Sequence, residues 1–78
     1  MPTPYFPSED ELRKIADTTH VPGLYVVARK RGIIHGGERA EDASHAQGLT
    51  GSIRTSFGEC DEVIIIQRDD QGRWFLLP

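Results

Sequence analysis

Residues 43–57 read ASHAQGLTGSIRTSF, and this stretch decides how the rest of the chain must fold. Apolar side chains recur along it at helical spacing and would form one stripe on a helix. The stripe consists of Ala43, Ala46, Leu49, Ile53 and Phe57. Asp42 is a suitable N-cap and Gly58 a suitable C-cap, so the sequence predicts a helix over 43–57.

The opposite side of this helix carries small, uncharged residues where a solvated helix normally carries long charged ones. The small residues are Ser44, Gly48, Gly51, Ser52 and Thr55. Arg54 is the only Lys, Arg, Asp or Glu between 43 and 57. Each helical glycine costs about 1 kcal/mol relative to alanine. Because small residues let another backbone come close, we expect this side to be covered by the first helix, a second copy of the chain, or a larger target.

Four strands are expected around this helix, in two hairpins. The expected ranges are 24–30, 33–35, 62–68 and 73–77. Arg31-Gly32 predicts the first tight turn, and Gly36-Gly37 is expected to end the second strand. The β-branched run Val63–Ile66 predicts a central strand that is covered on both faces. In the last strand, alternation places one of Trp74 and Phe75 in the core and the other at the surface.

The N-terminal part contributes one more helix. Three prolines among residues 1–7 predict an irregular segment there. Ser8 and Glu11 form a capping box, which predicts a helix from Ser8 to about Asp17. The expected order is αββαββ. The sequence therefore predicts one small α+β domain over 8–78, with a four-stranded antiparallel sheet packed on one main helix.

Composition excludes several classes of function. The chain has 78 residues, enough for a single small core, and one cysteine, Cys60, which rules out an intramolecular disulfide. This fits a reducing setting such as the cytoplasm of a bacterial host. We expect no signal peptide and no membrane span. A net charge of −3 disfavours direct nucleic-acid binding, which needs a dominant basic patch.

No pattern in the sequence indicates catalysis, a metal or a cofactor. His20, His35, His45 and Cys60 match no short ligand spacing, although Cys60 and His45 could pair if the fold joined them. His35-Gly36-Gly37 lacks the G-x-S-x-G nucleophile motif that would make it an oxyanion loop. Glycine-rich nucleotide loops are absent as well. We therefore expect a protein that is not an enzyme.

Charged residues near the strands are candidates for recognition. Five carboxylates flank the third strand, where they either solubilise it or form an acidic patch for a basic partner. They are Glu59, Asp61, Glu62, Asp69 and Asp70. The cluster Arg29-Lys30-Arg31 at the first hairpin tip is the one basic cluster, which is either solvated or touches phosphate. The candidate partner-binding residues are the five carboxylates and the five small helix residues.

From Pro22 onward, the layout resembles that of small phage-encoded anti-CRISPR proteins that inhibit type I surveillance complexes. The shared features are the strand that starts at Pro22-Gly23-Leu24-Tyr25-Val26-Val27, the helix rich in small residues and two closing strands. The resemblance implies a binding inhibitor that sterically blocks a CRISPR ribonucleoprotein complex from its target DNA. It assigns no residue role. Two alternatives remain open: a small nucleic-acid-binding regulator and an antitoxin-like module that self-associates.

Overall fold

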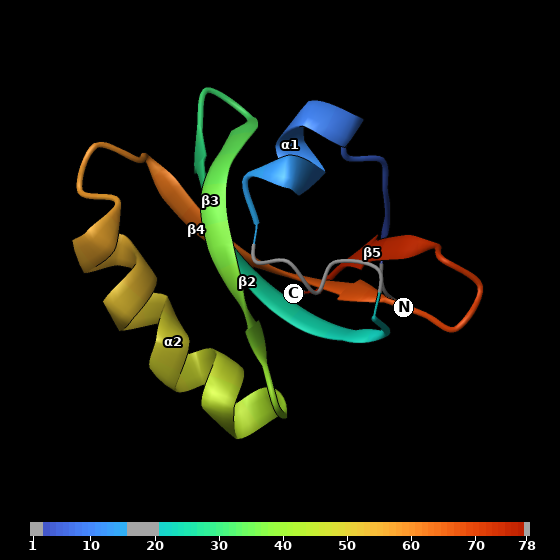
Figure 1. Cartoon of the computed structure of the whole chain (residues 1–78). Coiled ribbons are helices and arrows are strands. Elements are labelled where there is room, and N and C mark those ends of the chain that lie inside the picture. Colours follow the sequence, from blue (N-terminus) through green and yellow to red (C-terminus); the bar gives the residue numbers. More distant parts are fainter. Residues whose placement is uncertain (1–2, 16–20, 78) are drawn as a thin grey trace.

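The computed structural model describes residues 3–15 and 21–77, which form a five-stranded antiparallel sheet with a helix on each face (Figure 1). In chain order, the elements are β1 (Thr3–Tyr5), α1 (Glu9–Arg13), β2 (Gly23–Lys30), β3 (Ile33–Ala40), α2 (Ala43–Ser56), β4 (Glu62–Arg68) and β5 (Trp74–Leu76). The strand order is β1-β5-β4-β2-β3. The predicted α+β class is confirmed, but the sheet has five strands where four were expected.

Both predicted hairpins are present. Strands β2 and β3 are joined by Arg31 and Gly32, whose φ angles of 55° and 79° belong to the left-handed region. Two such residues in succession match the twist of the flanking strands. Strands β4 and β5 also pair antiparallel, and β2 pairs with β4 to unite the two hairpins in one sheet.

Strand β3 is longer than the sequence predicted, because Gly36 and Gly37 lie inside it instead of ending it. A Cβ atom at Gly36 would overlap the ring of Phe57. A Cβ atom at Gly37 would lie 2.5 Å from the carbonyl oxygen of Val26. The two glycines therefore let β3 pass close to its neighbours. Between Ala28 and Arg29 the register shifts, which leaves His35 without a partner on β2.

The N-terminal part differs most from the prediction. Residues 3–5 were expected to be irregular, but they form β1, which pairs with β5 through Thr3, Pro4 and Tyr5. Proline is compatible with this position because β1 is an edge strand. The predicted helix over 8–17 is shorter, since α1 ends at Arg13 and Ile15 forms a parallel bridge to Gly37; residues 16 and 17 lie outside the described residues. The predicted capping box of Ser8 and Glu11 is confirmed.

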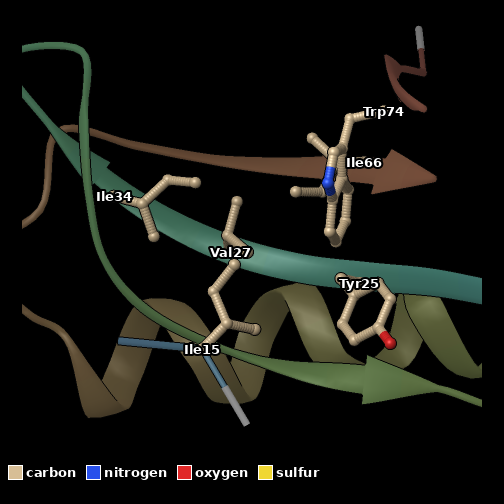
Figure 2. Packing of buried hydrophobic residues seen from close by; sticks show 6 residues of the cluster. All are labelled: Ile15, Tyr25, Val27, Ile34, Ile66 and Trp74. Carbon is tan, nitrogen blue, oxygen red and sulfur yellow. The ribbon is translucent and has the colours of Figure 1, made fainter. Parts of the chain in front are cut away.

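Each face of the sheet carries its own hydrophobic cluster. The cluster under α2 is built on Val26, Ala28, Ala40, Ala46 and Ile53. The cluster on the α1 side is built on Ile15, Tyr25, Val27, Ile34, Ile66 and Trp74 (Figure 2). Strand β4 contributes Val63 and Ile65 to the first cluster and Ile64 and Ile66 to the second. The prediction of a central strand covered on both faces is therefore confirmed, and of Trp74 and Phe75 it is Trp74 that is buried.

No helix among the described residues combines the length and the apolar character that crossing a bilayer requires. The longest, α2, has 14 residues and packs on β2, β3 and β4.

Candidate protein-binding surface

The outer side of α2 is open to solvent. Its five small residues, Ser44, Gly48, Gly51, Ser52 and Thr55, are all exposed. A Cβ atom added at Gly48 or Gly51 would meet nothing within 4 Å. We call these five residues the α2 outer face. Nothing described in this chain fills the space above its two glycines, so the close approach that they permit is left unused within the fold.

The helix that carries this face is fixed at its N-terminus and along its inner side. The Asp42 side chain accepts a hydrogen bond of 2.7 Å from the backbone amide of His45, and the Glu41 amide donates to Nδ1 of His45 at 2.9 Å. Ala46 and Ile53 anchor the inner side, where they are 0% and 3% exposed. The α2 outer face is therefore presented by a well-seated helix.

One of the three expected covers for this face is excluded. Helix α1 lies on the opposite side of the sheet, as Figure 1 shows, and it packs against β3. Leu12 and Ile15 join the cluster of Tyr25 and Trp74, which has no member from α2. The α2 outer face is therefore not covered by the first helix. A second copy or a larger target remain as the two expected occupants.

The carboxylates before and at the start of β4 have mostly internal partners. Asp61 accepts a hydrogen bond of 3.0 Å from the Arg31 amide and so fixes the β2–β3 turn. Glu62 forms an ion pair with Arg29, whose guanidinium also lies 5.9 Å from the centre of the Tyr5 ring. Burial alone lowers the pKa of Arg29, but hydrogen bonds to Tyr5 and Glu62 outweigh this and raise it. Glu59 is exposed.

Of the two carboxylates after β4, Asp69 also has its hydrogen-bond partners within the fold. Asp69 accepts hydrogen bonds from the amides of Gln71 (2.9 Å) and Arg73 (2.8 Å), and from Nε of Arg73 (2.8 Å). Slight desolvation raises the pKa of Asp69, but these hydrogen bonds and the charge of Arg73 outweigh it, so the pKa is lowered. Asp70 is exposed. The two acidic groups lie at opposite ends of β4, roughly 20 Å apart for a strand of this length, and do not form one patch.

A small hollow of 260 Å³ lies at the C-terminal end of α2. Lys30, His35 and Cys60 line it together with residues 56–59. A pair of Cys60 and His45 was left open by the sequence, on the condition that the fold joined them. The fold does not, because His45 lies in the first turn of α2 and Cys60 beyond its last, about 20 Å away along the helix. Within residues 3–15 and 21–77, no three His, Cys, Asp or Glu side chains are placed to hold a metal; His20 falls outside these ranges.

The three basic residues of the first hairpin have different surroundings. Arg29 is bound to Glu62, Lys30 lines the hollow beside Cys60, and Arg31 is exposed at the turn. One of the three positive charges is therefore already paired within the fold.

Comparison with known proteins adds no relative to this description. No family model matches the chain, and neither a curated protein nor a solved structure matches it. The surface residue that the sequence did not single out is Phe6, whose side chain is 89% exposed between two prolines.

Proposed function

We propose that this protein is a non-enzymatic inhibitor that docks on a larger protein assembly through the α2 outer face. The single observation that carries the proposal is the open space above Gly48 and Gly51 on a helix that is otherwise firmly packed. Two helical glycines cost stability, about 1 kcal/mol each relative to alanine. A residue pair that costs stability and is exposed is typical of a surface selected for contact with a partner.

The partner that we propose is a type I CRISPR surveillance complex. The proposal is supported by the layout that this chain shares with small anti-CRISPR proteins: a strand pair, a helix rich in small residues and two closing strands. Among the ten candidate residues, the exposed carboxylates are Glu59, Asp61 and Asp70. Asp61 already accepts a hydrogen bond from the Arg31 amide, which leaves Glu59 and Asp70 as the better candidates. We infer that they meet lysine or arginine side chains which otherwise hold target DNA, since complementary charges favour encounter and register.

A nucleic-acid-binding regulator has less support. Arg29 already pairs with Glu62, which leaves two basic residues, Lys30 and Arg31, at this hairpin tip. The gel-shift assay described next also tests this alternative, because it includes an arm with DNA and the protein but without the surveillance complex.

The experiment is a gel-shift assay of target DNA with a purified type I surveillance complex. We expect the wild-type chain to abolish the shift when it is added before the DNA. Gly48→Arg should lose this effect at least 10-fold, since a long charged side chain fills the close-approach surface. Thr3→Arg is the matched control: it adds the same charge at an exposed site on β1, which packs on β5 and away from α2.

Four outcomes decide the proposal. Inhibition that is lost in Gly48→Arg and kept in Thr3→Arg supports it. No inhibition at a large molar excess contradicts the proposed partner. Equal loss in both variants contradicts the proposed surface, and a shift of DNA by the protein alone favours the nucleic-acid-binding alternative.

A further inference from the structure

An apolar surface lies where β1 meets the start of β5, among residues that are not part of the α2 outer face. A hollow of 460 Å³ opens there, with aromatic walls formed by Tyr5, Trp74 and Phe75. Phe6 lines the hollow as well, together with Pro4 and Pro7, and is 89% exposed. Among the described residues, the other exposed large hydrophobic side chain is Ile33, at 50%. Exposed apolar area is thus concentrated beside an apolar hollow.

The charges around this hollow are balanced. Arg73 lines the hollow and pairs with Asp69 at 2.8 Å, while Asp70 of the same turn is exposed. A rim that carries both signs does not favour a strongly charged ligand. It does favour a surface with the same arrangement, because a two-fold axis would place Arg73 of one molecule near Asp70 of the other.

The backbone of β1 is a poor site for another strand. Pro4 has no N–H to donate, and β1 has only three residues, so the edge offers little to an added strand. A partner at this end of the sheet is therefore held through side chains, and Phe6 is the side chain most available for that purpose.

We propose that the hollow receives Phe6 of a second copy of this chain, which produces a weak two-fold dimer. Each molecule carries both the projecting ring and the hollow, so one symmetric contact buries both rings. The contact uses β1, β5 and the turn before β5, whereas α2 packs on β2, β3 and β4. The contact does not involve the α2 outer face. It shares one residue, Asp70, with the surface proposed for the inhibited partner.

The test is sedimentation equilibrium of the full chain from roughly 10 µM to 1 mM, a range that suits a weak interface. We expect concentration-dependent dimers and a matching change in the fluorescence of Trp74, the only tryptophan. Phe6→Ser should raise the dimer dissociation constant at least about 100-fold, because two buried rings are lost. Ile33→Ser is the matched control and should leave it unchanged, since Ile33 lies at the β2–β3 turn.

The structure makes the outcomes easy to separate. Phe6 is nearly fully exposed, so Phe6→Ser should stay folded, which circular dichroism checks. A chain that stays monomeric at 1 mM contradicts the proposal. So does a dimer that persists in Phe6→Ser, and a dimer that only Gly48→Arg removes would place the contact on α2 instead.

Discussion

The two faces of the sheet are covered by different means. On one face, a single 14-residue helix supplies Ala46 and Ile53 to a cluster with Val26 and Ala28. On the other face, the helix has five residues, and the cover is assembled from bulky side chains such as Tyr25 and Trp74, whose ring centres lie 5.3 Å apart. The first cover is built from one continuous stretch of chain, whereas the second depends on contacts between segments far apart in the sequence.

Both covers nevertheless rest on the same strands. Neighbouring residues of β2, such as Val26 and Val27, point into opposite clusters. Loss of packing in one cluster therefore also destabilises the strands that hold the other cluster. We expect the domain to unfold as one unit.

The largest test of this comparison is Ile53→Ala. Removing a buried isoleucine from under α2 should lower the free energy of unfolding by about 3 kcal/mol. Urea unfolding should be followed by circular dichroism, which reports α2, and by Trp74 fluorescence, which reports the opposite face. The two curves should coincide. A helix signal that is lost before the tryptophan signal would show that the two faces unfold separately.

Gly37→Ala tests the close packing inside β3. The added Cβ would lie 2.5 Å from the carbonyl oxygen of Val26 and 2.9 Å from the Cα of Val27, so the backbone itself must move. We expect the free energy of unfolding to fall by about 1–3 kcal/mol, as overpacking usually causes. Thermal unfolding measures the effect. An unchanged midpoint would show that β3 has room to spare at this position.

Glu11→Gln tests how α1 is attached to the sheet. The carboxylate of Glu11 accepts hydrogen bonds from the amides of Ile34 (3.0 Å) and Ser8 (3.1 Å). Burial raises the pKa of Glu11, but these hydrogen bonds and that of the Ser8 side chain outweigh it, so the pKa is lowered on folding. A carboxyl group with a lowered pKa stabilises the fold above its unfolded pKa, and this contribution is lost as the pH falls through the folded value.

We therefore expect Glu11→Gln to cost about 1 kcal/mol of unfolding free energy at pH 7 and almost nothing at about pH 3. Glu9→Gln is the matched control, because Glu9 is exposed and its ion pair with Arg13 is long at 3.9 Å. Urea unfolding across this pH range measures both variants. A constant difference between Glu11→Gln and the wild type at all pH values would contradict the role of the charge.

Gly51→Ala has the smallest expected effect, and its sign is opposite. The added methyl group meets nothing within 4 Å, and alanine favours the helix by up to about 1 kcal/mol over glycine. We expect the midpoint of thermal unfolding to rise. A fall would indicate that the α2 outer face packs against something within the molecule.

The contrast between the two faces also explains which parts of the fold could be predicted. Helix α2 and the two hairpins follow from local patterns: an apolar stripe, capping residues and the Arg31-Gly32 turn. The second half of β3 could not be predicted from local patterns. Gly36 and Gly37 are typical of the end of a strand, unless a ring such as that of Phe57 fills the space beside them. Strand β1 could not be predicted either, since three residues around a proline form a strand only when β5 lies beside them.

The candidate surface, too, has features that could be predicted from the sequence and features that depend on the fold. The small residues of the α2 outer face could be recognised from spacing, but the position of α1 was needed to show that they are exposed. The internal roles of Asp61 and Asp69 could not be read from the sequence, because each depends on a backbone amide that the fold brings within 3.0 Å. Phe6 was missed because no periodic pattern marks an exposed aromatic residue between prolines.

The most direct test of the central claim, that the α2 outer face is an open surface which the fold itself does not use, is the unfolding free energy of Gly48→Arg. Arginine favours a helix over glycine, and no atom lies within 4 Å of the position of its Cβ. We expect the variant to be as stable as the wild type or up to about 1 kcal/mol more stable. A loss of about 2 kcal/mol or more would contradict the account, because it would mean that this face is packed inside the folded chain.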